Sequence, residues 1–121
     1  MTWVRVAPVR VLDTRADGPQ VGYVGGKPVA GQTVELVVAG VGGVPADAGA
    51  VVLNVTATEP GAAGFVTVFP CGEPVPNGSS LNVRVGATVA NAVVAKVGID
   101  GKVCLYSNVA THLLVDVNGF H

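Results

Sequence analysis

The chain has 121 residues; half are hydrophobic, only 12% are charged, and the formal net charge is −1. This length and composition predict one globular domain, residues 1–121, with a real hydrophobic core, and they exclude a disordered chain. Glycine, proline, asparagine and aspartate interrupt every apolar run before the roughly 18 residues of a membrane-spanning helix, and the scattered basic residues disfavour nucleic-acid binding.

Valine dominates the apolar content, and 17 glycines and 8 prolines cut the chain at short intervals. Side chains branched at Cβ, such as valine, favour strands. The frequent glycine and proline residues would interrupt any long helix. We therefore expect about nine strands. In chain order they are residues 3–6, 9–12, 33–38, 51–58, 65–69, 81–85, 88–97, 102–106 and 111–117, with residues 21–24 as a further short edge strand.

The stretch over residues 48–72 is expected to be the central hairpin, two strands joined by a Glu-Pro-Gly-Ala-Ala-Gly loop. In its first strand Val51, Leu53, Val55 and Ala57 share one face, as expected for a strand with one buried side. The return strand is apolar on both faces, which is typical of a strand in the middle of a sheet. Asp100-Gly101 predicts a tight two-residue turn leading into residues 102–106.

These patterns predict an all-β fold, an antiparallel β-sandwich of jelly-roll or immunoglobulin-like kind. The two cysteines, Cys71 and Cys104, form no CxxC pair. They are compatible with a disulfide in an oxidising compartment or with two buried free thiols. We favour the disulfide, because the sparse charge and the Thr, Val and Gly content are typical of a secreted module.

Catalysis finds little support in the sequence. No serine lies in a G-x-S-x-G motif. His112 and Asp116 suggest a dyad, but four residues of strand separate their backbones by roughly 13 Å. The histidine, aspartate and cysteine residues show no metal-ligand spacing, so we expect neither a metal nor another cofactor. A hydrolase that uses His112 and Asp116 is the least favoured function.

Polar residues within apolar strands are the next candidates. Asn91 shares its face with valines, and a buried asparagine must find hydrogen-bond partners. It is expected to tie a loop or a bulge. The alternative is a ligand-binding polar cluster made with Asp13, Arg15, His112 or Asp116. For Asp13 and Arg15 we favour a salt bridge that ties the first strand to the sheet.

Binding of a glycan usually needs an exposed aromatic side chain that stacks on a sugar ring. Trp3 and Tyr23, beside Gly-rich loops, are the best candidates for such a role, whereas Phe65 and Phe69 are expected in the core. For Trp3 and Tyr23 we nevertheless favour the other interpretation, that they cover the bottom of the core.

Several motifs together resemble a repeated module common in large secreted or surface proteins of actinobacteria. They are RVLDTR (10–15), GVPADAGAVVLNVTATEP (43–60), GFVTVFPCG (64–72), SSLN (79–82), TVANAVVAKVG (88–98) and THLLVDVNGF (111–120). The resemblance covers almost the whole chain. It implies a non-catalytic passenger domain, often tandem or attached to secreted hydrolases, and it names no ligand. A single copy departs from the tandem habit, as an excised domain would.

The function expected from these observations is a non-catalytic extracellular binding or adhesion module that recognises glycans or another part of the cell envelope. The alternative is a structural module that self-associates into a homo-oligomer or spaces other domains. Thr2 and Trp3 follow Met1 where a signal peptide would have a basic and then an apolar region. An extracellular location therefore predicts a natural leader upstream of Met1.

Overall fold

The computed structural model describes residues 2–121, so Met1 and the expected leader lie outside the described part. The described chain forms eight strands and one short 3-10 turn. The strands are β1 (Val4–Asp13), β2 (Thr33–Val37), β3 (Ala50–Thr58), β4 (Gly64–Pro70), β5 (Leu81–Val83), β6 (Val89–Lys96), β7 (Lys102–Ser107) and β8 (His112–Phe120). Within residues 2–121 no helix has the length and apolar character needed to cross a membrane.

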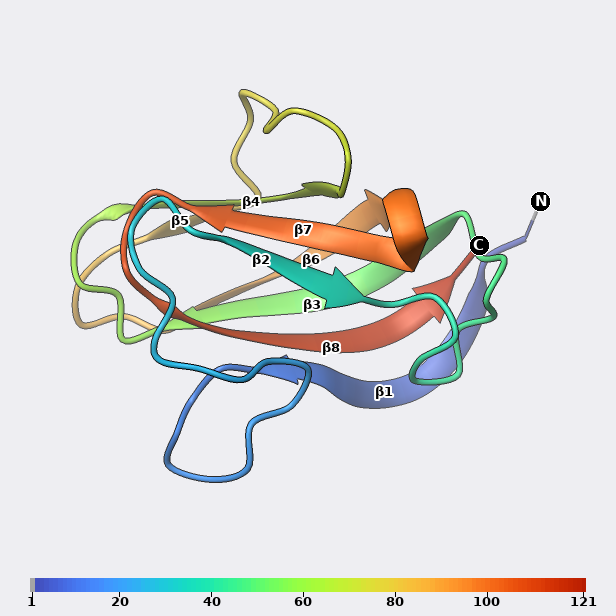
Figure 1. Ribbon diagram of the computed structural model, residues 1–121, viewed down its shortest axis with the longest axis horizontal. Coiled ribbons are helices and arrows are strands. Elements are labelled where there is room, and N and C mark those ends of the chain that lie inside the picture. The colour runs from blue at the N-terminus through green and yellow to red at the C-terminus, as the bar shows by residue number, and fades with distance from the viewer. Residues whose placement is uncertain (1) are drawn as a thin grey trace.

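The strands form two four-stranded antiparallel sheets, in the orders β1-β8-β3-β6 and β2-β7-β4-β5 (Figure 1). The predicted antiparallel β-sandwich is therefore confirmed. The pairs β4–β5, β3–β6, β2–β7 and β1–β8 are nested within one another along the chain. Such nesting arises when a long two-stranded antiparallel ribbon coils into two layers. This is the jelly-roll topology, so the sandwich is of the jelly-roll kind and not of the immunoglobulin-like kind.

The predicted central hairpin is wrong, because β3 and β4 lie in different sheets. The loop between them bridges the two layers and is tied at that end of the sandwich by a hydrogen bond from the Gly61 amide to the Ala110 carbonyl, 2.8 Å. The alternation of side chains indicates which face of each strand is buried, but it does not indicate which strand pairs with which. A connection of five residues can close a hairpin or cross from one sheet to the other equally well. The prediction that β4 lies inside a sheet is confirmed, since β7 and β5 flank it.

The turn at Asp100-Gly101 forms with positive φ at both residues, 59° and 72°, as its sequence predicts. It does not close a hairpin, however, because β6 and β7 also belong to different sheets. Local turn chemistry therefore fixes the backbone of these two residues without fixing which strands pair.

The start of the chain also differs from the prediction. β1 runs through Pro8 as one strand, because it lies at the edge of its sheet, where a missing N–H is tolerated. Residues 21–24 form no strand; only Val21 makes an isolated bridge, to Asp13. Eight strands therefore form where about nine were expected.

The core lies between the two sheets. The expectation that Phe65 and Phe69 belong to it is wrong: β4 turns Val66 into the core, while Phe69 belongs to a separate cluster and Phe65 is only partly buried. The predicted inward face of β3, which includes Leu53 and Val55, is completely buried. Each of the other fully buried large side chains comes from β1, β2, β4, β7 or β8 or directly follows β2; they are Leu12, Leu36, Val38, Val66, Val103, Leu105, Leu113, Val115 and Val117. Burial of apolar area on this scale is the main stabilising contribution to such a fold.

The predicted disulfide forms between Cys71 and Cys104. It belongs to a small second cluster with Phe69 and the partly buried Tyr106, separate from the main core. The loop between β4 and β5 stands over this face of the sheet (Figure 1), and the hydroxyl of Thr67 donates a hydrogen bond to the Gly78 carbonyl, 3.0 Å. The bridge thus fastens a loop on the outside of the sandwich.

Candidate functional site

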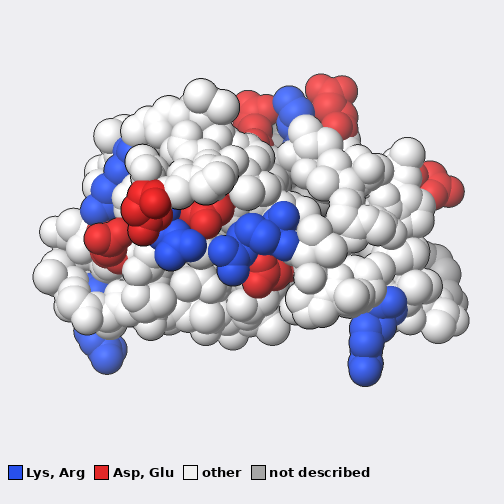
Figure 2. Space-filling model, turned by 90° about the horizontal axis from the view of Figure 1, so that it is seen from below, with Lys and Arg blue, Asp and Glu red and all other residues white. Residues whose placement is uncertain are grey.

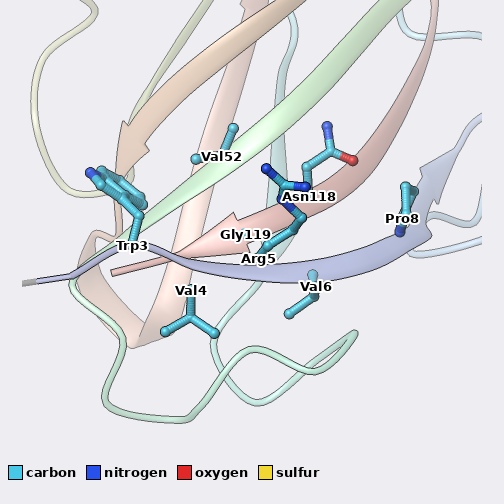
Figure 3. A pocket seen from close by; sticks show the side chains of 8 residues that line it. All are labelled: Trp3, Val4, Arg5, Val6, Pro8, Val52, Asn118 and Gly119. Carbon is cyan, nitrogen blue, oxygen red and sulfur yellow. The ribbon is translucent and has the colours of Figure 1, made fainter.

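A hollow of about 490 Å³ opens on the outer face of the β1-β8-β3-β6 sheet (Figure 3). Three parts of the chain line it: Trp3, Val4, Arg5, Val6 and Pro8 from the first strand and the residue before it, Val52 from β3, and Asn118 and Gly119 from β8. We call this hollow the Trp3 groove. It combines an aromatic side chain, an aliphatic wall and the polar side chains of Arg5 and Asn118 in one place.

Irregular strand pairing produces the groove. The β1–β8 ladder pairs Arg5 with Gly119 and then Val9 with Val117, so three residues of β1 face the single residue Asn118. The β3–β8 ladder also steps over Asn118. Pro8 has no N–H to donate, so the ladder cannot continue regularly through it. Extra residues bend a strand at such a bulge, and the hollow lies where β1 bends.

The side chains around the groove divide into two sets. In Figure 3 the side chains of Trp3, Val52, Arg5 and Asn118 lie on the same side of β1, whereas Val4 and Val6 point to the other side. A ligand lying against the outer face of the sheet therefore meets an indole, a guanidinium and an amide together.

Gly119 forms the floor of the groove, and its position requires glycine. A Cβ atom placed there would lie 2.8 Å from the Val4 carbonyl oxygen, closer than real Cβ contacts. Because β1 and β8 approach closely here, the groove surface at Gly119 consists of backbone atoms alone.

Trp3 is the single tryptophan of the chain, and its side chain is well exposed, 46% of the residue surface. One neighbour limits its movement: the ring centroids of Trp3 and His121 lie 4.7 Å apart, with 41° between the ring planes. The indole is therefore both accessible and supported, which is the state that a stacking platform needs.

Tyr23 lies elsewhere and is not part of the groove. It is partly buried against the main core, and its hydroxyl donates a hydrogen bond to the Gly26 carbonyl, 2.7 Å. The two aromatic candidates therefore differ: Tyr23 covers the core, as favoured from the sequence, whereas Trp3 is exposed and lines an open hollow.

The other candidate residues from the sequence gather along the pairing of β1 with β8. Arg10 Nε donates to Asp116 Oδ1 at 2.5 Å, and a second nitrogen of Arg10 lies 3.6 Å from Asp13 Oδ2. Arg15 donates two hydrogen bonds to the Asp13 carboxylate, from Nε to Oδ1 at 3.1 Å and from Nη2 to Oδ2 at 2.9 Å. The predicted Asp13–Arg15 salt bridge forms, but it joins residues two apart in the chain, so the ion pair that ties β1 to the sheet is Arg10–Asp116 instead. Figure 2 looks at the molecule from the side on which β1 lies, and acidic and basic side chains are interleaved there on an otherwise uncharged surface.

His112 takes a different partner from Asp116. Its Nδ1 lies 3.0 Å from the hydroxyl oxygen of Thr14, and the same oxygen accepts a hydrogen bond from the Leu113 amide, 3.0 Å. Thr14 is completely buried. A nucleophile must be reachable by its substrate, so this pair suits a tie between the end of β1 and the start of β8 better than a catalytic dyad.

Asn91 is exposed, so the expectation that it is buried is wrong. Its amide nitrogen donates to the Ser80 carbonyl at 3.0 Å, which ties β6 to the end of the β4–β5 loop as predicted. It contributes nothing to the cluster around Asp13.

The ionised Asp13 carboxylate stabilises the fold, which gives a first prediction. Hydrogen bonds from the Arg15 guanidinium, with a further one from the Arg15 amide, hold the pKa of Asp13 below its ordinary value. Replacing Asp13 by asparagine is expected to lower the free energy of unfolding at pH 7 by about 1–2 kcal/mol, a figure reduced because Arg15 is partly exposed to solvent. Urea titration measures this loss, with the exposed Asp47→Asn as control.

The pH dependence of the Asp13→Asn variant follows from the same pKa. A carboxylate whose folded pKa is depressed stabilises the fold above its unfolded pKa, and this contribution disappears as the pH falls through the folded value. The difference in stability between wild type and variant should therefore be constant above about pH 5 and shrink below about pH 4. A difference that persists unchanged into strong acid would show that the carboxylate charge is not the cause.

Sequence reasoning named only Trp3 among the eight residues that line the groove and missed the other seven, including the polar Arg5 and Asn118. Pro8 within an apolar strand and the Asn118-Gly119 pair near the end of another were the available signals, since both mark irregular strands. Comparison with known proteins adds no relative: no family model matches the chain, and no curated protein matches its sequence.

Proposed function

We propose that this domain is a non-catalytic binding module of a secreted or cell-surface protein and that it holds a glycan of the cell envelope in the Trp3 groove. The observation that carries the proposal is the exposed, supported indole of Trp3 beside Arg5 and Asn118. The remaining candidates are engaged in internal contacts: Asp116 binds Arg10, and His112 binds Thr14.

The groove suits a sugar for chemical reasons. One face of a pyranose ring carries mainly C–H groups, which stack on an aromatic face, while its hydroxyls project from the ring edge. Asn118 supplies both donors and an acceptor for such hydroxyls, and Arg5 supplies donors. A volume of about 490 Å³ is within the range of roughly 300–1,000 Å³ typical of sites for small ligands.

An extracellular location is supported by the disulfide. Cys71 and Cys104 are paired, and disulfides persist mainly in oxidising compartments. The resemblance to modules of secreted actinobacterial proteins points in the same direction. Both observations favour a ligand that lies outside the cytoplasm.

Self-association or a spacer role draws less support. Self-association through strand pairing needs a free sheet edge, and β6 is one of the edges. Its Asn91 is bonded to Ser80 at the β4–β5 side, and Lys96 ends the strand with an exposed charge. Charged ends and covered edges are the features by which monomeric sheets avoid pairing with one another.

Replacing Trp3 by alanine tests the proposal. The wild-type domain is expected to sediment with purified actinobacterial cell walls, and the Trp3→Ala variant to bind them at least about tenfold more weakly, because a central aromatic contact typically contributes 2 kcal/mol or more. Depletion of protein from the supernatant measures the affinity. In the wild type, a change of tryptophan fluorescence reports directly on the groove, since Trp3 is the single tryptophan.

The control is Ile99→Ala, which removes another exposed apolar side chain, from the turn before β7. It should bind as the wild type does. A wild type that binds no cell-wall or glycan preparation, or a Trp3→Ala variant that binds equally well, would rule out the groove as a glycan site.

A further inference from the structure

We infer that the glycan in the Trp3 groove is acidic and that Arg5 binds a carboxylate on it. This inference, which rests on the proposed function, begins with a difference among the arginines. Arg10, on β1, forms an ion pair with Asp116, and Arg15, just after β1, forms one with Asp13. Arg5 is exposed, lines the groove, and forms no ion pair within residues 2–121.

The position of Arg5 suits a group carried by a stacked sugar. Trp3 and Arg5 are two residues apart on nearly extended chain, about 7 Å, and their side chains lie on the same side of β1 (Figure 3). A sugar ring stacked on the indole therefore brings its own substituent, or that of the next ring, over the guanidinium. Asn118 lies beside Arg5 and adds an amide that can donate to the same anion.

The surroundings strengthen such a contact. Trp3, Val52 and Pro8 provide apolar walls, and an ion pair gains strength where such walls exclude part of the water. The groove is open, so water hydrates the guanidinium before a ligand binds. The unpaired charge of Arg5 therefore costs the free molecule little desolvation free energy. The free molecule therefore tolerates an arginine whose charge a ligand then uses.

The outer face of this sheet carries a second cation besides Arg5, although the whole chain has a net charge of −1. Val52 pairs with Val94 on β6, and Ala50 pairs with Lys96, so alternation places Lys96 on the same outer face as Val52. Lys96 is exposed and, like Arg5, has no ion-pair partner in the described chain. The nearest acid along β8, Asp116, is already bound to Arg10.

A carboxylate fits this site better than other anions. The guanidinium is planar and presents two parallel N–H groups, which match the two oxygens of a carboxylate. One carboxylate also balances the single charge of Arg5, whereas a phosphate monoester carries nearly two negative charges at neutral pH. A phosphodiester carries one, and the hydrogen fluoride treatment below distinguishes it from a carboxylate. The chemical class is therefore a uronic acid or another sugar with a carboxyl substituent.

The experiment compares three preparations of one actinobacterial cell wall: untreated, with carboxylates converted to neutral methylamides by carbodiimide coupling, and with phosphate-linked polymers removed by aqueous hydrogen fluoride. We expect the wild type to bind the amidated wall about 10- to 100-fold more weakly than the untreated wall, the range of a charge-assisted contact. Removal of phosphate should leave binding unchanged. Added NaCl should weaken binding to the untreated wall.

Arg5→Gln keeps a long polar side chain without the charge. This variant should bind untreated and amidated walls equally, at the level of the wild type on amidated walls. Arg84→Gln is the matched control, since Arg84 is another exposed arginine that has no ion pair in the described chain and lies outside the groove. It should behave as the wild type does.

Other results would overturn the inference in distinguishable ways. Equal binding of wild type to untreated and amidated walls would show a neutral glycan, with the proposed function intact. Loss of binding on hydrogen fluoride treatment alone would replace the carboxylate by a phosphate. Failure to bind any of the three walls would overturn the proposed function together with the inference.

Discussion

Replacing Cys71 and Cys104 together by serine is expected to lower the free energy of unfolding by about 4 kcal/mol. The bridge joins residues separated by 33 positions, and closing a loop of this length in the unfolded chain corresponds to that value in the chain-entropy description. A domain of this size is stable by about 5–15 kcal/mol, so the loss is a large fraction of the total.

The location of the bridge determines what should survive its removal. Phe69 and the two cysteines form a cluster outside the main core, so the two sheets should keep their packing. Urea unfolding measures the loss, and near-UV circular dichroism follows the packing of the folded variant. Dithiothreitol should weaken the wild type and leave the double serine variant unchanged. Equal stability of the reduced and oxidised wild type would show that the bridge contributes nothing.

Replacing Leu53 by alanine is expected to lower the free energy of unfolding by about 3–4 kcal/mol. Leu53 is completely buried in β3, which lies between β8 and β6, so neighbours on both sides limit how far the structure relaxes into the cavity. The loss combines the transfer of the removed methyl groups to solvent with the cost of that cavity. Urea unfolding with an unchanged slope measures it.

The control for Leu53→Ala is Val94→Ala on the neighbouring strand β6. Val94 is 65% exposed on the outer face, so its truncation should change stability by no more than about 0.5 kcal/mol. A larger loss for Val94→Ala than for Leu53→Ala would mean that the inner and outer faces of this sheet are assigned the wrong way round.

Side-chain alternation predicted the buried faces well, because burial on one side of a strand acts on each residue separately. Val51, Leu53, Val55 and Ala57 on β3 all point into the core as their spacing indicated. Strand partners were less predictable. β3 and β4 follow one another in the chain but lie in different sheets, since a short connection can cross between layers as well as return.

The candidate site was predictable only in part, for a related reason. The Asp13–Arg15 pair was expected from residue type and spacing, and Trp3 was named as a candidate, although its exposure was the less favoured interpretation. The groove itself depends on pairing between the first and last strands and on the bulge around Asn118. Both features depend on how β1 pairs with β8, whose residues lie more than a hundred positions apart in the chain. The role of Arg5 therefore could not be inferred from its neighbours in sequence.

The pairing of Val4 with Phe120 brings both ends of the chain out at the same end of the sandwich (Figure 1). A pulling force applied at these ends therefore loads the hydrogen bonds of the β1–β8 ladder one after another, which peels the two strands apart. The first rung to open after Val4–Phe120 joins Arg5 to Gly119, and both residues line the groove. If the groove holds the proposed glycan, mechanical tension along the polypeptide should release it before the sandwich unfolds.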